Sequence, residues 1–301
     1  MSETKPNRPP RPVLCGEVLF DHFPDGHTVL GGAPFNVAWH LQAFGLRPLL
    51  ISRIGADREG ERIEAAMTEW GLDTAGLQRD PAHPTGAVQV SLDDGEPAFH
   101  VLPDRAWDHL DADRLPNLDG AGLLYTGSLI RRSPASSRAV EVLQQHPLPR
   151  FLDVNLRTPW WSAESVLEMM HGARWLKLNE DELRRLSPDA RPLAERAEAL
   201  REQSGAESLL VTRGERGAIL HTGSPRPLRV VPDAGSKVVD SVGAGDAFVS
   251  VMIAGRLLDW PDHVALIRAQ AFASAIVGQR GAVPDSAAFY RPFLQAWQLA
   301  T

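Results

Sequence analysis

The hydrophobic and polar positions in the first third of the chain predict strands, helices and two hairpins. Apolar runs at residues 12–20 and 48–54 indicate buried strands. Helical spacing of apolar residues predicts helices at residues 36–44 and 59–70. Residues 23–30 contain a Pro-Asp-Gly turn, and residues 87–101 alternate around Asp94 and Gly95, the strongest hairpin signal in the chain.

From residue 120 onward, short apolar runs alternate with helical segments. Strands are predicted at residues 122–125, 150–154, 173–178, 208–212 and 218–221. Helices are predicted at residues 136–145, 164–171, 180–186, 192–204, 244–257 and 264–277. This alternation is typical of a parallel sheet that helices cover on both faces. We therefore expect one α/β domain, with the two early hairpins projecting near its ligand-binding edge.

The composition narrows the class of protein. Of 301 residues, 43% are hydrophobic and 23% charged, which is enough to bury a full core. The net charge of −7 argues against a nucleic-acid-binding or anionic-membrane surface. The single cysteine, Cys15, excludes an internal disulfide and suits a reducing cytosol. Residues 1–12 are polar and rich in proline, so we expect a disordered tail and no secretory signal. We also expect no membrane span and a cytoplasmic protein.

Residues 238–249 carry the strongest chemical signal. A β-branched run meets Gly243, Ala244 and Gly245, and Asp246 follows in the first turn of a predicted helix. Small residues let successive N–H groups converge with the positive end of that helix, which forms a hole for an anion. A carboxylate beside it can accept the proton of an attacking hydroxyl during phosphoryl transfer. The alternative is that Asp246 only caps the helix and the glycines form a tight turn.

Several well-known fingerprints are missing from the sequence. No Gly-Lys pair occurs, so the chain has no G-x-x-x-x-G-K-[ST] phosphate loop. It also lacks G-x-G-x-x-G, H-E-x-x-H, paired cysteines and G-x-S-x-G. Dinucleotide enzymes, zinc hydrolases and serine hydrolases therefore lose support.

The sequence DSVGAGDAF at residues 240–248 closely resembles the C-terminal signature of the ribokinase-like (PfkB) carbohydrate kinases. Further matches follow in order after Pro12, at residues 31–38, 54–60, 153–157, 177–182 and 212–217. Several matches in the right order are more specific than any one of them, which weakens the helix-cap alternative for Asp246. The resemblance implies an α/β fold over residues 13–301, with a ribokinase-like, mostly parallel sheet flanked by helices. A small β lid would come from approximately residues 20–31 and 86–103.

The resemblance also implies a sugar site under the lid. Asp21 matches an aspartate that holds two sugar hydroxyls, a role that suits a carboxylate because it accepts two charge-assisted hydrogen bonds. Gly31 and Gly32 would let the backbone approach the sugar, and Asn36 would bond another hydroxyl. Arg157 would lie near the acceptor and the transferred phosphoryl group. The alternatives are that Asp21 is a solvated turn residue, that Gly31 and Gly32 form an ordinary turn, that Asn36 caps a helix and that Arg157 lies on the surface.

An ATP site and a Mg²⁺ site are implied in the same way. Asn179 and Glu182 match a motif that holds the water shell of Mg²⁺ and the phosphates, although exposed residues at a helix start would look the same. A K⁺ site near Asp240 and Gly281 is common in such kinases and stays open here. The residues expected near the nucleotide are Lys177, Asn179, Thr212, Gly214, Gly217 and Gln270. Among them, Gln270 carries the weakest signal, because a helix can hold glutamine for solubility alone.

Asp246 is thus expected to be the base, and Gly243, Ala244 and Gly245 the anion hole. The sequences GEVLFD at 16–21 and GGAPFN at 31–36, with Asp-x-Asn-x-Arg at 153–157, look most like fructokinases. The first hypothesis is therefore ATP-dependent phosphorylation of D-fructose to fructose 6-phosphate. Phosphorylation of 2-keto-3-deoxygluconate, ribose or a nucleoside is the alternative. A catalytically silent sugar-binding regulator, a nucleotide-binding scaffold and a homodimer joined through the lid also stay open.

Overall fold

The computed structural model describes residues 8–93, 96–233 and 238–299. Within these ranges a nine-stranded sheet has the order β13-β12-β11-β10-β9-β8-β1-β4-β5. The strands from β11 to β5 in this order are parallel, and β12 and β13 extend the sheet antiparallel. The bounds are Arg11–Cys15 (β1), Leu49–Gly55 (β4), Leu77–Asp80 (β5), Ala121–Gly127 (β8), Arg150–Asp153 (β9), Trp175–Asn179 (β10), Ser208–Thr212 (β11), Ala218–His221 (β12) and Leu228–Val230 (β13). The mostly parallel α/β sheet predicted from the sequence is confirmed.

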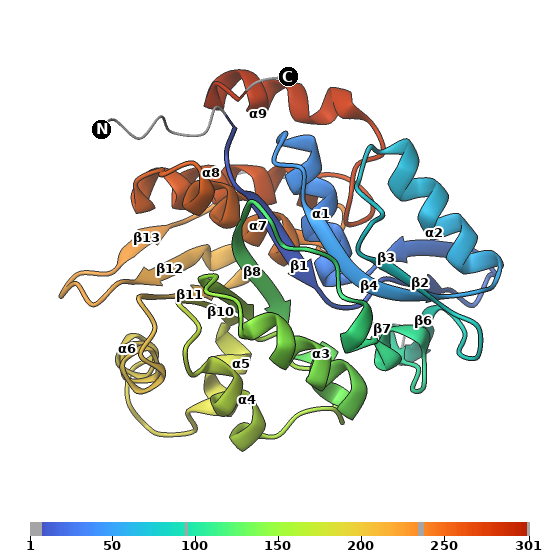
Figure 1. Ribbon diagram of the computed structural model, residues 1–301. Helices are drawn as coiled ribbons and strands as arrows, with labels where there is room; N and C mark the ends of the chain where they lie inside the picture. The colour runs from blue at the N-terminus through green and yellow to red at the C-terminus, as the bar shows by residue number, and fades with distance from the viewer. Residues whose placement is uncertain (1–7, 94–95, 234–237, 300–301) are drawn as a thin grey trace, which may run out of the picture.

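Helices cover both faces of this large sheet (Figure 1). One face carries α1 (Ala33–Ala43), α7 (Ala244–Leu257) and α8 (Asp262–Val277), and α2 (Arg58–Glu69) lies beside β4. The other face carries α3 (Pro134–Gln144), α4 (Ala163–Met170), α5 (Glu180–Leu186) and α6 (Leu193–Ser204). The last helix, α9 (Ala287–Trp297), packs outside α1 and α8 through ring contacts among Phe44, Phe272, Tyr290 and Trp297. These apolar contacts fix the C-terminal helices against the body.

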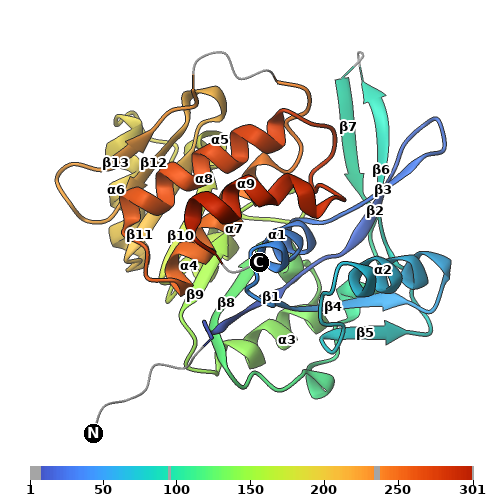
Figure 2. The same ribbon diagram turned by 90° about the horizontal axis from the view of Figure 1, so that it is seen from above.

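A second, smaller sheet projects from the body beside α2 (Figure 2). Its order is β3-β2-β6-β7, with bounds Leu19–His22 (β2), Thr28–Gly31 (β3), Gly86–Asp93 (β6) and Glu96–Val101 (β7). The pairs β2–β3 and β6–β7 are antiparallel hairpins, and β2 and β6 join them in parallel. We call these four strands the small sheet. The turn predicted at Asp94 and Gly95 lies outside the described residues.

The apolar run at residues 12–20 was predicted as one strand, and this prediction is wrong. The run divides at residues 16–18 into β1 of the large sheet and β2 of the small sheet. Gly16 lies at the division, where a Cβ atom would stand only 2.3 Å from Pro34 Cγ. Apart from Gly16 and Glu17 the run is apolar, because both strands are buried there. Strand β1 begins at Arg11, so residues 11 and 12 belong to the sheet and not to a tail.

A half-buried aspartate, Asp57, ties the small sheet to the body. Asp57 caps α2 by accepting a bond of 2.8 Å from Gly60 N. Its two oxygens also accept bonds from the N–H and hydroxyl of Thr85, at 2.8 and 2.6 Å. Gly60 packs so closely that a Cβ would lie 2.2 Å from Gly55 O. The stretch at residues 54–60 therefore anchors the chain just before β6.

Some elements were not foreseen. The predictions omitted β5, β13, α9 and four 3₁₀ turns, at Ala106–His109 (η1), Ala112–Arg114 (η2), Leu129–Arg132 (η3) and Gly214–Arg216 (η4). Each is short, polar or, in α9, interrupted by Pro292. Among the helices that the structure describes, none combines the length and apolar character that crossing a bilayer requires.

Candidate active site

A cavity of about 460 Å³ lies between the large sheet and the small sheet. The small sheet contributes Leu19, Asp21, Val88, Phe99 and Val101 to its wall. The body contributes most of the residues predicted for the sugar and the chemistry, and also two, Lys177 and Asn179, that were predicted to lie near the nucleotide. These are Gly32, Asn36, Arg157, Lys177, Asn179, Gly243, Gly245 and Asp246. Residues from distant parts of the sequence thus meet at one site, as predicted for ligands at the carboxyl ends of parallel strands.

A second cavity, of about 670 Å³, lies beside the first. Its wall includes residues predicted to contact the nucleotide, together with apolar side chains of α7 and α8. Predicted residues in this wall are Thr212, Gly214, Gly217, Ala244, Gly245 and Gln270. Thr212, Ser241 and Gly245 line both cavities. The loop that begins α7 therefore lies between the two cavities and forms part of the wall of each.

Asp246 lies in the first turn of α7 and lines the first cavity. Its Oδ2 accepts a hydrogen bond of 2.8 Å from Nδ2 of Asn36 on α1. Burial raises the pKa of Asp246 to about 6, against the opposing effects of the Asn36 bond and of the charges on Lys177 and Arg157. A carboxylate with this pKa is still ionised at neutral pH and is a stronger base than an exposed aspartate. Asn36 acts as an orienting partner here, and it does not cap α1, whose cap residue is Gly32.

The turn before α7 needs glycine at its cap. Gly243 has φ of 78°, and a Cβ there would lie 2.4 Å from Ala282 Cβ. The N–H groups of Ala244, Gly245 and Asp246 belong to the first helical turn, where the helix itself supplies no acceptor. Ala244 N makes a long contact of 3.4 Å to Ser241 O, which closes the turn. The remaining donors and the helix dipole give this loop the properties of an anion site.

A buried ion pair lies against the same loop. Lys177 Nζ bonds both oxygens of Asp153, at 2.9 and 3.2 Å. Burial alone would lower the pKa of Lys177, but the carboxylates of Asp153 and Glu182 outweigh it and raise that pKa. A Cβ on Gly245 would stand 3.4 Å from Lys177 Nζ, so the ammonium lies beside the backbone of the loop. Its positive charge adds to the anion site.

The predicted sugar ligands cluster where β2 and β3 face the body. Burial raises the pKa of Asp21 to about 6, and the nearby Arg157 and His22 charges partly offset this. A Cβ on Gly31 would lie 3.7 Å from Asp21 Oδ2. Gly32 has φ of 108°, and a Cβ there would lie 2.7 Å from Glu17 O. Gly32 thus has no space for a side chain, whereas a Cβ at Gly31 would make only an ordinary van der Waals contact.

Glu17 is a site residue that the sequence analysis missed. Its side chain is buried, lines the first cavity, and has an oxygen, Oε2, without a hydrogen-bond partner. Burial raises the pKa of Glu17 to about 7; its own backbone, Ala33 and the Arg157 charge oppose this, and the Asp246 charge adds to it. The available signal was a charged residue inside the apolar run at 12–20. Asp153 and Asn155 were also seen only as part of a motif, and Asn155 lines this cavity.

Asn179 and Glu182 form a reciprocal cap at the start of α5. Asn179 Oδ1 accepts a bond of 2.9 Å from Glu182 N, and Glu182 Oε2 accepts one of 2.7 Å from Asn179 N. Glu182 Oε1 accepts a third bond, of 2.9 Å, from Leu156 N. Asn179 lines the first cavity, whereas Glu182 is buried behind these backbone bonds. Of the two, only Asn179 faces a cavity; both oxygens of Glu182 already accept backbone bonds.

The predicted cation residues also come together. Asp240 Oδ2 accepts a bond of 3.0 Å from Gly281 N, and Oδ1 accepts one of 3.0 Å from Val242 N. This carboxylate therefore holds the loop after α8 against the loop before α7.

Around the second cavity, Gly217 has φ of 75° and contacts β13 so closely that a Cβ would lie 1.9 Å from Val230 O. Gln270, mostly buried, donates to Ser274 Oγ at 3.1 Å.

Comparison with known proteins identifies the family. Residues 16–288 match the pfkB family carbohydrate kinase model. The chain is 30% identical over 269 residues to a probable fructokinase-4 of Arabidopsis thaliana, covering 80% of each chain. It is 27% identical over 267 residues to a fructokinase of Vibrio alginolyticus, covering 83% of this chain and 86% of that one.

Solved structures agree with this match. A Vibrio cholerae fructokinase double mutant, solved with fructose, ADP and potassium ion, superposes with a TM-score of 0.80 at 27% identity. That alignment covers 95% of this chain and 99% of the other. A sugar kinase of Pyrococcus horikoshii, solved with ATP, gives a TM-score of 0.77 at 26% identity over 90% of this chain and 93% of that one. The chain therefore belongs to the pfkB family of carbohydrate kinases and is a phosphotransferase that acts on a sugar hydroxyl.

Proposed function

We propose that this kinase transfers the γ-phosphoryl group of ATP to D-fructose, with Asp246 as the base. The observation that carries the proposal is the place of Asp246. Its carboxylate lies at the start of α7, and the loop there lines both cavities. A hydroxyl in the first cavity and a phosphate at the loop would then meet beside one carboxylate. This is the arrangement that in-line phosphoryl transfer requires.

In this proposal the sugar occupies the first cavity. Asp21 and Asn36 would bond its hydroxyls, Gly31 and Gly32 would allow close approach, and Arg157 would face the transferred group. The primary hydroxyl would point at Asp246, which accepts its proton as the bond to phosphorus forms. The small sheet would act as a lid that excludes water, so that ATP is not hydrolysed in the absence of sugar.

The second cavity would hold the nucleotide. Thr212, Gly214, Gly217 and Gln270 line it, and its volume of about 670 Å³ suits a ligand of that size. The phosphates would reach the N–H groups of Gly243, Ala244 and Gly245, beside the Lys177 ammonium. These groups are suited to stabilise negative charge that develops on the transferred phosphoryl oxygens.

Two cation sites accompany the proposal. Asn179 and Glu182 would hold the water shell of Mg²⁺, and the ion would neutralise phosphate charge. The support for this placement is that Asn179 lines the first cavity and that Glu182 fixes it there through their reciprocal cap. A K⁺ site is proposed at backbone carbonyls near Asp240 and Gly281, where the two loops meet.

Fructose is favoured over the other acceptors by two observations. Relatives at 27–30% identity are named fructokinases, and one solved relative contains fructose with ADP. The Asp-x-Asn-x-Arg residues Asp153, Asn155 and Arg157 stand at or beside the first cavity. 2-Keto-3-deoxygluconate, ribose and nucleosides are the competing acceptors.

A coupled assay of ADP release with fructose, ribose, 2-keto-3-deoxygluconate and adenosine tests the proposal. We expect fructose to give the highest kcat/KM, and NMR of the product to show phosphate on the primary 6-hydroxyl. Absence of fructose turnover beside turnover of another acceptor would refute the substrate but keep the kinase. Binding of ATP without turnover of any acceptor would favour a nucleotide-binding scaffold.

A further inference from the structure

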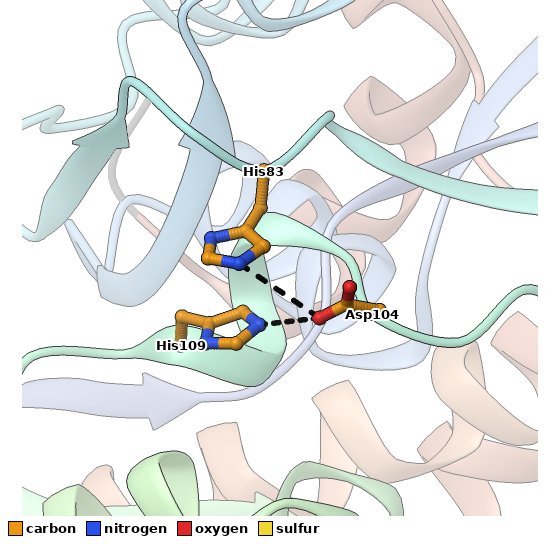
Figure 3. Close-up of side chains that lie close together, drawn as sticks. All are labelled: His83, Asp104 and His109. Carbon is orange, nitrogen blue, oxygen red and sulfur yellow. Dashed lines mark hydrogen bonds and ion pairs between the residues drawn. The ribbon is translucent and has the colours of Figure 1, made fainter.

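A cluster of two histidines and one aspartate lies where the β6–β7 hairpin joins the body (Figure 3). His83 precedes β6, Asp104 follows β7, and His109 ends η1. The two chain segments that connect the hairpin to the body therefore both contribute to the cluster. None of its three residues lines either of the cavities described above.

The three side chains converge on one point. The imidazole rings stack with centroids 3.5 Å apart and an interplanar angle of 9°. His109 Nε2 lies 2.7 Å from Asp104 Oδ1, and His83 Nε2 lies 3.8 Å from the same oxygen. Figure 3 shows both rings directing a nitrogen toward the carboxylate.

A buried carboxylate sets the tautomer of His83. Its Nδ1 lies 3.1 Å from Oδ2 of Asp80, a residue only 1% exposed. Arg53 Nε contacts that same oxygen at 3.0 Å, so the Asp80 charge is compensated and the carboxylate only accepts. In the neutral ring, Nδ1 of His83 therefore carries the proton and Nε2 presents its lone pair to Asp104. A carboxylate that orients a histidine in this way is common behind metal-binding imidazoles.

This arrangement leaves two acceptors facing each other. Asp104 Oδ1 accepts the hydrogen bond from His109 Nε2 at 2.7 Å, so this carboxylate oxygen also faces the rings as an acceptor. A distance of 3.8 Å is too long for a hydrogen bond from a protonated His83. A cation between Nε2 of His83 and Oδ1 of Asp104 would satisfy both groups. His109 would then turn its own Nε2 lone pair to the same ion.

The spacing fits a small transition-metal ion. Zn²⁺ bonds imidazole nitrogen and carboxylate oxygen at about 2.0–2.2 Å, which places tetrahedral ligands roughly 3.3 Å apart. The observed separations of 2.7 and 3.8 Å lie on either side of that value. The Asp104 side chain is 74% exposed, so it can shift to complete the site, and an ion can enter from solvent. Two imidazoles and a carboxylate leave a fourth position for water.

We propose that His83, Asp104 and His109 bind one Zn²⁺ ion that joins the two chain segments at the base of the β6–β7 hairpin. The ion would connect the segment before β6 with the segment after β7 and with η1. It would thereby fix the orientation of the strands that supply Val88, Phe99 and Val101 to the first cavity. The site is independent of the phosphoryl-transfer chemistry and of the choice of sugar.

Metal titration of nucleotide-free protein tests this site. The chelator-treated chain is titrated with Co²⁺, which gives visible absorption bands on binding, and then with Zn²⁺ as competitor. We expect one equivalent of Co²⁺, displaced by Zn²⁺, and a melting temperature that rises with Zn²⁺ concentration. His83→Gln, His109→Gln and Asp104→Asn should each weaken binding at least about tenfold.

The matched control is His263→Gln, which removes an exposed histidine of α8 and should leave the titration unchanged. Far-ultraviolet circular dichroism and the metal-free melting temperature show whether each variant is folded. Failure of the wild-type chain to bind an equivalent of either metal would overturn the proposal. So would a folded His83→Gln/His109→Gln double variant that binds Co²⁺ as tightly as the wild-type chain.

Discussion

At the residue scale, the bond between Asn36 and Asp246 explains how a buried carboxylate is kept oriented. Asn36 donates its amide N–H to Oδ2 at 2.8 Å, so Oδ1 stays available to the first cavity. The hydrogen-bond donor belongs to α1 and the acceptor to α7, 210 residues apart in sequence. The base is thus positioned by packing between two helices and not by its own turn alone.

Replacing the carboxylate should separate chemistry from binding. Asp246→Asn keeps an acceptor oxygen for Asn36 but removes the base, so we expect kcat to fall by about 10²–10⁴-fold. The dissociation constant of the sugar, measured by calorimetry, should change little. Asp181→Asn, an exposed aspartate of α5, serves as control and should keep full activity. A folded Asp246→Asn enzyme with near-normal kcat would exclude Asp246 as the base.

The raised pKa of Asp246 predicts the acid side of the activity profile. The base acts as the carboxylate, and its ionised fraction falls as pH falls through about 6. We expect kcat to be flat near pH 8 and to decrease about tenfold per pH unit well below 6. Asp21, whose pKa burial also raises to about 6, would affect sugar binding and hence kcat/KM. A kcat that stays constant down to pH 5 would contradict this assignment.

Glu17 makes a prediction about stability. Burial raises its pKa from an ordinary 4.5 to about 7, so its protonated form is favoured in the folded protein. Its stabilising contribution is full below about pH 4.5 and is lost as pH rises through about 7. Glu17→Gln removes the cost of the buried charge. Urea unfolding should therefore show a gain of up to about 3 kcal/mol at pH 8 and little gain at pH 4.5.

Glu202→Gln, on the exposed side of α6, is the control and should show no such pH-dependent gain. The same Glu17→Gln variant should bind the sugar differently, because Glu17 lines the first cavity. A variant less stable than the wild-type chain at pH 8 would show that Glu17 is ionised and paired in the folded protein.

At the element scale, the sequence predicts chemistry better than it predicts boundaries. The order of glycines and aspartate at residues 243–246 gave the start of α7, because only small residues fit beside Ala282. The division of the run at 12–20 could not be predicted, because a strand buried in either sheet shows the same apolar pattern. Glu17 was missed for a similar reason: its neighbours in space, Asp246 and Arg157, lie far away in the sequence.

The turn before α7 allows a test with a matched glycine. Gly243→Ala adds a Cβ at φ of 78° and within 2.4 Å of Ala282 Cβ. Gly205→Ala adds a Cβ at φ of 72° with no atom within 4 Å. Both carry a backbone cost of about 1–2 kcal/mol, and only Gly243→Ala must also move its neighbours.

We expect Gly205→Ala to lower the melting temperature slightly and to keep kcat. Gly243→Ala should lower the melting temperature further and reduce kcat by at least about tenfold, because the anion site is displaced. Differential scanning fluorimetry and the coupled assay measure the two effects. Equal losses of stability and activity in both variants would mean that the turn matters only through its backbone conformation.

At the scale of the whole molecule, the proposed sugar site and the proposed nucleotide site lie in different cavities, and different parts of the fold bound each cavity. The first cavity is bounded by the small sheet on one side and by the body on the other. The second is bounded by the body alone, mainly by α7, α8 and the loops that follow β11 and β13. Changes in the small sheet should therefore act on the sugar and leave the nucleotide unaffected.

Phe99 on β7 tests this division. It lines the first cavity although its side chain is half exposed, at 48%. We expect Phe99→Ala to raise the KM for the sugar by up to about tenfold, because the ligand loses an apolar contact of roughly 1–2 kcal/mol. The KM for ATP should stay the same. Ile267→Ala removes an exposed apolar side chain of α8 and should change neither constant.

The residues that line both cavities restrict how such an enzyme can change its specificity. Thr212, Ser241 and Gly245 line both cavities, so a substitution that reshapes one cavity through them disturbs the other. Remodelling the small sheet should accommodate a new acceptor with the least disturbance, because its strands line only the first cavity. Engineering for a different carbohydrate should begin on those strands and leave the start of α7 intact.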